Sequence, residues 1–333
     1  MHRRKVQKTG GSTYFVTLPK NWAESVGIRP GAVVTLMPNQ SGTLLLVPES
    51  LSQENRCAIE LQDWDFDRFQ REIMSRYIVG YDIIEIRRDR IRPEQRRMMR
   101  EIAQRLVGLE IFDETKETVI LQAMVNVRDF PVQRTLSRVF DITHVMLTDA
   151  VSAFCKNDSQ LARDVLERDG DIDRLVLLVA RQFSLLLRDL LLEEDVGLSR
   201  LEFLHYHTVA DQLERVADHA GKISEATLAL DKAVMDDVAA DIEQRARDAT
   251  SVLGRAVQAF ENRNLDLANA VLTEKERSER LFQITRRTAA EKQPEAAPSI
   301  SIVIDSLLRI REYAFNIAES ALDAPSSGHV GDA

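Results

Sequence analysis

Residues 211–225, DQLERVADHAGKISE, carry the pattern that decides how most of the chain is interpreted. Apolar residues recur at the spacing of an α-helix and predict a packed face: Leu213, Val216, Ala220 and Ile223. At about 100° per residue, Asp211, Glu214 and Asp218 fall on another face, within about 60° of one another. The segment therefore predicts an amphipathic helix that is apolar on one side and acidic on another.

The three carboxylates leave two interpretations open. Carboxylates within two helical turns repel one another unless water or a cation screens them. Hard cations such as Mg²⁺ or oxidised iron prefer sites rich in oxygen ligands. Acidic faces on solvated helices are also common, and on spacing alone they are the commoner explanation. The helix is therefore either a metal-binding element or a solvated acidic face.

The helix at 211–225 is also part of an internal repeat. A shift of 106 residues aligns 147–175 with 253–281, and 11 of these 29 positions are identical. The helix itself aligns with 305–319 at a shift of 94 residues. The change of shift predicts 12 extra residues in the first copy, around 190–199.

The region that contains the repeat shows helical patterns only, with Leu and Ala prominent at the apolar positions. Short connections between neighbouring helices are typical of helical bundles. The predicted fold class of this C-terminal region is therefore all-α, with two tandem three-helix bundles. Its six helices are expected at 131–156, 158–192, 198–229, 231–262, 264–291 and 299–323.

Two smaller regions precede the bundle. Residues 55–127 alternate strand and helix patterns in the order β-α-β-α-β-β, which predicts a small α/β domain. Residues 1–50 predict short strands and turns around one short helix, hence an all-β domain. A domain of fifty residues buries little surface by itself, so we expect this one to oligomerise. The predicted domains are 1–50, 55–127, 131–229 and 230–324.

Charge is distributed unevenly along the 333 residues, whose formal net charge is −9. Residues 1–50 contain six Lys or Arg and two acidic residues, a net of +4, so the remaining 283 residues carry −13. A basic N-terminal domain can bind a polyanion, whereas the acidic remainder as a whole cannot. Cys57 and Cys155 lack a C-x-x-C spacing. This argues against a disulfide framework or a cysteine zinc site, and it fits a cytoplasmic location.

Two classes of function are disfavoured by the sequence. The most apolar stretch, 175–192, includes Arg181 and Asp189, so it is too charged to span a bilayer and predicts a buried bundle helix without membrane insertion. Motifs of covalent catalysis and nucleotide-binding loops are missing. A single Glu-x-x-His pair, Glu202 and His205, falls short of the two pairs in di-metal oxidases. The chain is therefore predicted not to be an enzyme.

Residues 87–100 form a second charged cluster, with seven arginines and two acidic residues. Contact with a nucleic acid or another anion is one interpretation of this cluster. The other is a solvated helix with its flanking loop, facing the acidic bundle. We favour the second interpretation, because no aromatic side chain is interleaved with the arginines.

Residues 3–47 resemble the swapped-hairpin DNA-binding domains of the AbrB/MazE/SpoVT type. The resemblance rests on RKVQKTGGS at 4–12, VTLPKNW at 16–22, GIRPG at 27–31 and LLLVP at 44–48. It implies an obligate dimer with interlaced hairpins, which would supply the burial that fifty residues lack. It also implies salt-dependent contact with DNA phosphates through basic side chains at the start of the domain: Arg3, Arg4, Lys5 and Lys8.

Residues 131–323 resemble two tandem three-helix repeats of the PhoU family of phosphate-uptake regulators. The most specific matching text is LERVADHA at 213–220, followed by ISE at 223–225. The region between the two modules resembles the linker domain of archaeal-type fusions that join them. Together the resemblances cover nearly the whole chain.

The PhoU resemblance also implies a metal site. In that family a Glu/Asp-x-x-x-Asp motif on this helix of each repeat is associated with bound metal. Here the motif corresponds to Glu214 and Asp218, with Asp211 nearby, and the ion would be iron, zinc or magnesium. In the second repeat Glu312 takes the last acidic position, but Leu308 replaces the first acid, which halves the ligand set expected there.

These resemblances imply a cytoplasmic, dimeric, DNA-binding transcriptional regulator of phosphate uptake. Its bundle would sense phosphate status through a metal, or through a phosphate ABC transporter ATPase or a sensor kinase. The alternative is an adaptor that docks on the transporter or kinase without binding DNA, with the N-terminal domain used only for dimerisation. An antitoxin-like module is a weaker third hypothesis, because the folded body is much longer than the usual antitoxin tail.

Overall fold

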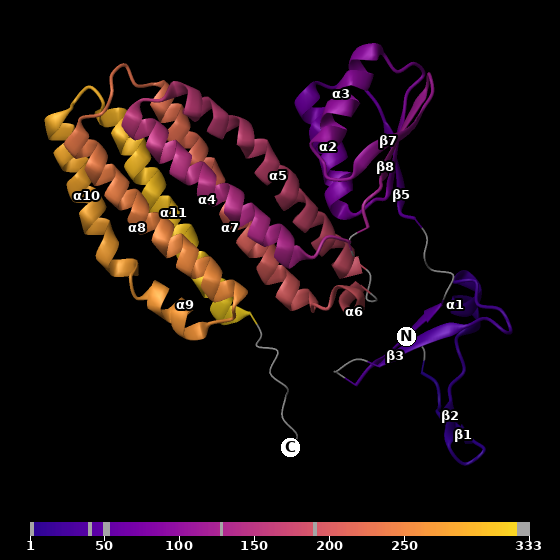
Figure 1. The fold of residues 1–333 in the computed structure, drawn as a ribbon. Coiled ribbons are helices and arrows are strands. Elements are labelled where there is room, and N and C mark those ends of the chain that lie inside the picture. Colours follow the sequence, from indigo (N-terminus) through magenta and orange to yellow (C-terminus); the bar gives the residue numbers. More distant parts are fainter. Residues whose placement is uncertain (1–2, 39–41, 49–53, 127–128, 189–191, 325–333) are drawn as a thin grey trace. The chain divides into compact units, whose positions relative to one another are not determined.

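The computed structural model describes residues 3–38, 42–48, 54–126, 129–188 and 192–324. The chain divides into two compact units, Met1–Asn55 and Arg56–Ala333. The first unit is rich in strands, and the second contains a small mixed sheet followed by long helices (Figure 1). The predicted fold class, with its all-β, α/β and all-α regions in this order, is confirmed.

The N-terminal unit consists of two antiparallel hairpins and one short helix. Its elements are β1 (Gln7–Thr9), β2 (Thr13–Phe15), α1 (Lys20–Ser25), β3 (Val34–Pro38) and β4 (Leu44–Pro48). Gly10 and Gly11 form the tip of the first hairpin with φ of 59° and 83°, which glycine adopts without strain. Pro48 is the one buried residue in the described part of this unit. A single copy of the unit therefore has no apolar core in its described part.

A four-stranded sheet with two helices opens the second unit, and we call it the middle domain. Its elements are β5 (Arg56–Glu60), α2 (Phe66–Val79), β6 (Ile83–Arg87), α3 (Pro93–Gln104), β7 (Leu109–Glu114) and β8 (Thr118–Ala123). The strand order is β5-β6-β8-β7, with β5 and β6 parallel and the other pairs antiparallel. Phe69 and Tyr77 of α2 and Met99 of α3 belong to the same buried cluster as Ile84 and Leu121 of the sheet.

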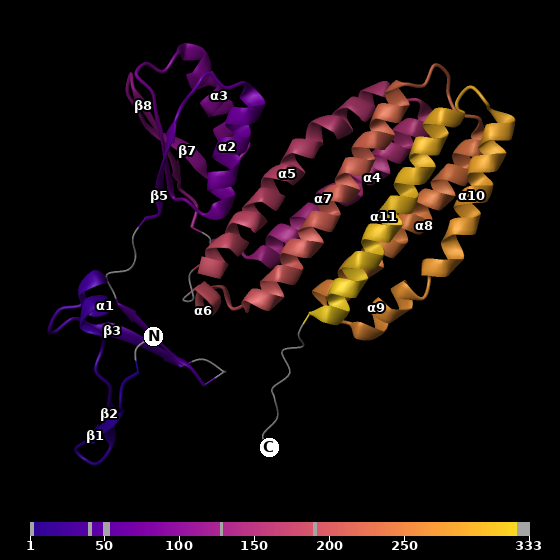
Figure 2. The ribbon, with the colours of Figure 1, turned by 180° about the vertical axis from the view of Figure 1, so that it is seen from behind.

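The rest of the second unit is a bundle of long helices that run side by side (Figures 1 and 2). The first repeat contains α4 (Val132–Lys156), α5 (Ser159–Arg188), α6 (Leu192–Val196) and α7 (Arg200–Leu228). The second contains α8 (Asp236–Glu261), α9 (Leu265–Leu272), α10 (Lys275–Lys292) and α11 (Ala297–Asp323). Among the described helices, none combines the length and the apolarity that a membrane span requires.

The bundle differs from the prediction in two places. The helix expected at 264–291 is divided into α9 and α10, and Thr273 and Glu274 lie between them. At the break the Thr273 hydroxyl donates to the carbonyl of Ala270. In addition, the extra residues of the first copy contain the short helix α6.

An ion pair occurs at the same place in both repeats with its charges exchanged. In the first repeat, Arg168 Nη1 lies 2.7 Å from Asp149 Oδ2. In the second, Arg255 Nη1 lies 2.6 Å from Glu274 Oε1. The shift of 106 residues relates Asp149 to Arg255 and Arg168 to Glu274. The two pairs therefore support the repeat alignment independently of the apolar pattern.

A buried arginine joins the first repeat to the middle domain. The side chain of Arg181, on α5, is 4% exposed. Its Nη1 donates to the carbonyls of Tyr77 (2.7 Å) and Tyr81 (2.8 Å), and its Nη2 to Asp82 (3.0 Å). Beside this contact Gly80 ends α2 at φ 96°, and a Cβ there would lie 2.8 Å from a methyl carbon of Leu185. The close approach of α2 to α5 therefore requires this glycine.

Most arginines of the cluster at 87–100 form ion pairs with carboxylates of the middle domain. Six of its seven arginines form ion pairs there: Arg87 with Glu85, Arg88 and Arg92 with Asp63, Arg96 and Arg100 with Glu114, and Arg97 with Glu94. These contacts agree with a helix and its flanking loop. The partners, however, belong to the middle domain and not to the bundle.

We predict that Arg181→Met destabilises the chain by about 2–4 kcal/mol, because it removes three charge-assisted hydrogen bonds from a buried junction. Urea unfolding followed by circular dichroism measures this change. Arg163→Met is the matched control, since Arg163 lies exposed on the same helix. Equal stability losses in the two variants would contradict the prediction.

Candidate functional site

The basic residues predicted to meet DNA lie together at the start of the N-terminal unit. Arg3, Arg4 and Lys5 precede β1 and are exposed, and Lys8 lies within β1. The Lys8 ammonium is 5.7 Å from the ring centroid of Tyr14 on the neighbouring strand β2. Four cationic side chains within six residues are thus accessible on one arm of the unit.

The acidic residues of α7 meet a second acidic pair on α5. Burial raises the pKa of Asp169 and of Asp173, and repulsion from Asp218 raises both further. Both α5 residues therefore lie close to α7, against which α5 packs. We call the five carboxylates of these two helices the acidic face: Asp169, Asp173, Asp211, Glu214 and Asp218. The sequence analysis placed the three α7 carboxylates on one helix face. The structure adds two carboxylates of α5 beside them, which the sequence analysis did not identify.

Burial and mutual repulsion both act on the acidic face. Burial, followed by the charges of Asp218, Asp173 and Asp211, raises the pKa of Glu214 to about 7. Burial, followed by Asp169 and Asp218, raises the pKa of Asp173 to about 6, while Arg105 of the middle domain lowers it. The acidic face is therefore only partly solvated, and its negative charges oppose one another.

The donor chemistry of the acidic face suits a hard cation. All five groups are carboxylates, the ligand type that Mg²⁺ and oxidised iron prefer, and a cation would relieve the repulsion between them. His207 Nδ1 extends the face, at 3.5 Å from Asp211 Oδ2. Among the described residues, however, no three His, Cys, Asp or Glu side chains are gathered closely enough to hold a metal ion.

Glu312, the acidic residue predicted in the second repeat, has a different environment. It lies on α11, and its Oε2 is 2.6 Å from Nη1 of Arg309. Glu312 is not among the charges that raise the pKa of Glu214 or of Asp173. The structure thus brings Asp211, Glu214 and Asp218 together but leaves Glu312 in an ion pair on its own helix.

The sequence contained a signal for the missed pair. Asp169 and Asp173 are four residues apart, the same spacing as Glu214 and Asp218. Residues at this spacing lie on one face of a helix. Only the packing of α5 against α7 shows that the two faces meet.

Glu202, the first residue of the single Glu-x-x-His pair, has a structural role. Its carboxylate accepts a hydrogen bond from the backbone N–H of Ser199 at 2.9 Å, and Ser199 Oγ accepts from the N–H of Glu202. This capping box starts α7, and Glu202 also pairs with Arg263 at 2.6 Å. These bonds give Glu202 a structural role, which is to cap α7 and to pair with Arg263.

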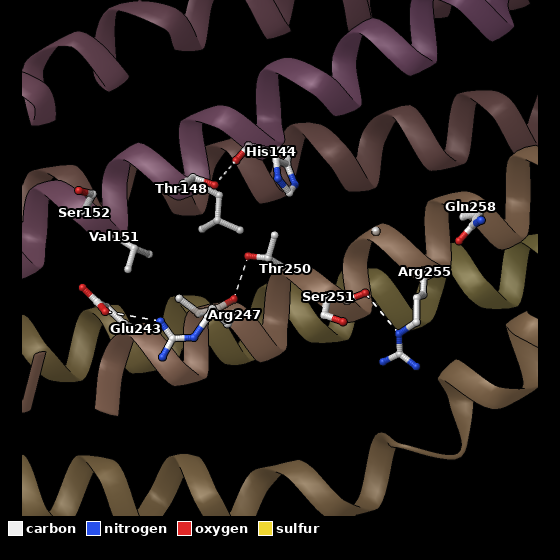
Figure 3. Close-up of a pocket in the computed structure, with 13 residues that line it drawn as sticks. His144, Thr148, Val151, Ser152, Glu243, Arg247, Thr250, Ser251, Arg255 and Gln258 are labelled. Carbon is white, nitrogen blue, oxygen red and sulfur yellow. Dashed lines mark hydrogen bonds and ion pairs between the residues drawn. The ribbon is translucent and has the colours of Figure 1, made fainter. Parts of the chain in front are cut away.

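A cavity of about 590 Å³ lies between α4 and α8, the first helices of the two repeats (Figure 3). The hydroxyls of Thr148 and Thr250 donate to backbone carbonyls of their own helices, and Arg247 pairs with Glu243 at 3.5 Å. A Cβ at Gly254 would meet nothing within 4 Å. Several polar groups of the cavity thus bond to groups of their own helix. The cavity therefore offers mainly apolar surface to a ligand.

Family models match both parts of the chain. The PhoU domain model matches residues 136–227 and 242–321, together just over half of the 333 residues. The model described as "Antidote-toxin recognition MazE, bacterial antitoxin" matches residues 7–54. These ranges cover the helical repeats and the N-terminal unit, and they leave the middle domain unmatched.

A likeness to a solved structure supports the helical fold of the repeats. PhoU from Pseudomonas aeruginosa is 22% identical with a TM-score of 0.51, covering 57% of this chain and 93% of its own. The phosphate transport system regulatory protein PhoU from Streptococcus pneumoniae is 18% identical with a TM-score of 0.49, covering 60% of this chain and 96% of its own. No curated protein matches the chain.

The raised pKa of Glu214 predicts a pH-dependent stability in the presence of a chelator. Between the ordinary glutamate pKa of 4.5 and the raised pKa of about 7, the folded state binds a proton that the unfolded state releases. The free energy of unfolding contributed by this group therefore falls as pH rises through that window, and it levels off above it. Urea titrations from pH 5 to 8 would show a smaller fall in Glu214→Gln than in the unmodified chain. Parallel curves for the two proteins would contradict the prediction.

Proposed function

Because the chain belongs to the PhoU domain family, we propose that it is a dimeric, DNA-binding regulator of phosphate uptake. In this proposal the helical bundle relays phosphate status, and the N-terminal unit binds DNA. The observation that carries the proposal is the fusion of an exposed basic hairpin unit to the paired helical repeats.

Exposed apolar side chains support the dimer. In the N-terminal unit Tyr14 is 69% exposed, Val33 63%, Leu36 54% and Leu44 60%. Apolar surface of this extent on a unit without a core is unstable in water, and a second copy of the unit would cover it. The interlaced hairpins of the MazE-type domain provide the arrangement by which this burial would occur.

Charge supports the DNA contact. Arg3, Arg4, Lys5 and Lys8 are exposed, and a dimer presents eight such side chains. Phosphates neutralised by these groups would release counterions, so binding would weaken steeply with salt. The acidic remainder of the chain, with a net charge of −13, would keep other surfaces away from DNA.

The DNA proposal predicts that the full-length protein binds duplex DNA taken from upstream of phosphate-transport genes. With eight phosphate contacts, the logarithm of the binding constant falls against the logarithm of salt concentration with a slope of about −7. Replacing Arg3, Arg4, Lys5 and Lys8 with Ala abolishes binding and leaves the dimer intact. Fluorescence anisotropy at several salt concentrations measures the binding, and analytical ultracentrifugation the dimer.

Two further variants sharpen this experiment. The control Lys20→Ala removes a cation of the same unit that already pairs with Glu24 at 3.7 Å, and it leaves binding nearly unchanged. Leu36→Asp places a charge in the exposed apolar surface and is expected to abolish both dimerisation and DNA binding. A dimer that captures transporter subunits or a sensor kinase but shows no DNA binding would replace the proposal with the adaptor alternative.

We further propose that the acidic face holds a metal ion. Because no three of these side chains are gathered closely enough in the described structure, an ion would have to draw Asp169, Asp173, Glu214 and Asp218 together, with Asp211 nearby. A bound hard cation would supply positive charge, which the face lacks. The carboxylates would provide oxygen ligands, and the partial burial of Glu214 would limit competition from water.

The metal proposal predicts that Mg²⁺ or Mn²⁺ raises the melting temperature of the chelated protein, and that elemental analysis finds metal in the untreated protein. The double variant Glu214→Gln and Asp218→Asn loses both effects. Glu312→Gln is the matched control in the second repeat. We expect it to keep both the bound metal and the rise in melting temperature, because Glu312 is paired with Arg309. Unchanged metal content in the double variant would identify the face as a solvated one.

A further inference from the structure

The cavity of about 590 Å³ between α4 and α8 lies where the two repeats meet. Pairs of positions related by the shift of 106 residues line it from both sides: His144 and Thr250, Thr148 and Gly254, and Ser152 and Gln258. Every residue of these two helices is described. A ligand held in the cavity would therefore contact both repeats at corresponding positions.

The glycine of one pair leaves part of the space open. Gly254 lies in the interior of α8, where glycine stabilises a helix less than alanine does. Its φ is not positive, and a Cβ added to it would meet nothing within 4 Å. Neither the backbone conformation nor close packing therefore requires a glycine at this position. The equivalent residue, Thr148, carries a side chain that faces the gap from α4 (Figure 3).

The walls around this space are mainly apolar. Leu147 is fully buried, and Val151 and Ala246 are 6% and 7% exposed. Cavities of several hundred Å³ between the helices of a bundle, with apolar walls and few polar groups, are typical sites for small organic molecules. The size and lining of this cavity fit such a ligand.

One polar group of the lining lacks a partner. The Nδ1 atom of His144 is buried and has no hydrogen bond among the described residues. The imidazole lies 5.8 Å from the ring of Phe140, measured between centroids, and Figure 3 shows it between α4 and α8. A buried polar atom without a hydrogen bond costs free energy, and a polar group of a ligand would supply the missing bond.

The arginines and the glutamate of the described lining are already in ion pairs. Arg247 pairs with Glu243 at 3.5 Å, and Arg255 forms two bonds with Glu274, of 2.6 and 2.8 Å. An ionised ligand would have to compete with these pairs or lose its hydration without gaining a partner. The charges of the lining therefore favour an uncharged occupant.

We propose that this cavity binds an uncharged, mainly apolar small molecule with a single hydrogen-bonding group, of the size of a two-ring heteroaromatic compound. The apolar walls hold the rings, and His144 bonds to the polar group. The site does not depend on the DNA-binding or the metal proposal, and each of the three can fail without the others.

The test is isothermal titration calorimetry of the full-length protein with indole, which is uncharged and has one N–H donor. We expect one saturable site per chain. Indole-3-acetate and tryptamine add a negative and a positive charge to the same rings, and we expect both to bind at least about tenfold more weakly. His144→Phe keeps a ring without its polar atoms and weakens indole binding about threefold to tenfold. The same variant leaves the binding of 1-methylindole, which lacks the N–H donor, unchanged.

Gly254→Leu fills the cavity and is the sharpest variant. It is expected to abolish indole binding and to raise the melting temperature, because leucine favours the helix. Gly170→Leu is the matched control, since Gly170 is exposed on α5 and a Cβ there also meets nothing within 4 Å. The control makes the same gain in helix preference away from the cavity, so it keeps indole binding.

The outcomes separate the possible occupants of the cavity. The absence of saturable indole binding would overturn the proposal, as would equal indole affinity in the unmodified chain, Gly254→Leu and His144→Phe. Loss of self-association in Gly254→Leu by analytical ultracentrifugation, without indole binding to the unmodified chain, would replace the proposal with a contact between copies. If Gly254→Leu does not fold, His144→Phe and the two charged analogues still decide the question.

Discussion

The packing of α7 against α11 is the contact around which the bundle is organised. The two helices are the third helices of their repeats, and their apolar positions correspond at the shift of 94 residues. All eight residues of these matched positions are fully buried: Leu213, Val216, Ala220 and Ile223 on α7, and Leu307, Ile310, Ala314 and Ile317 on α11. Gln212 and Asn316 form a hydrogen bond of 2.9 Å between the helices, and the rings of His219 and Tyr313, which are equivalent residues, lie 5.8 Å apart. Because apolar burial dominates the stability of such a bundle, these positions are the ones that both copies must keep.

Where the apolar contacts are kept, the two repeats have diverged in charge. The first repeat carries the acidic face between α5 and α7, whereas in the second Leu308 replaces the acid at the position of Glu214. The second repeat instead buries Arg311 where the first has Ala217. The exchanged pairs Asp149–Arg168 and Arg255–Glu274 show that opposite charges can occupy one framework position without altering the packing. The two repeats therefore place different charged residues on the same arrangement of helices.

The periodicity of apolar residues predicted most of the fold, because they recur at helical spacing along each helix of the bundle. The break between α9 and α10 was not predicted, since the apolar pattern of 264–291 does not mark it. The α7 residues of the acidic face were predicted because helical spacing alone places them on one side of α7. Asp169 and Asp173 were missed because their contact with α7 depends on the rotation of α5, and spacing within one helix does not determine that rotation. Arg181 was recognised as an obstacle to membrane insertion, but its three acceptors in the middle domain lie about 100 residues earlier in the sequence.

The position of α5 connects the acidic face to the rest of the second unit. Asp173 and Arg181 lie on this helix eight residues apart, which is about 12 Å along its axis. Arg181 is bonded to the end of α2, and Arg105 of the middle domain acts electrostatically on Asp173. A change of charge at the acidic face therefore acts on a helix that is fixed to the middle domain at one end, and on a cation of that domain directly. The hydrogen bonds described above that join the bundle to the middle domain come from Arg181, a residue of the first repeat. The first repeat is thus in direct contact with the middle domain.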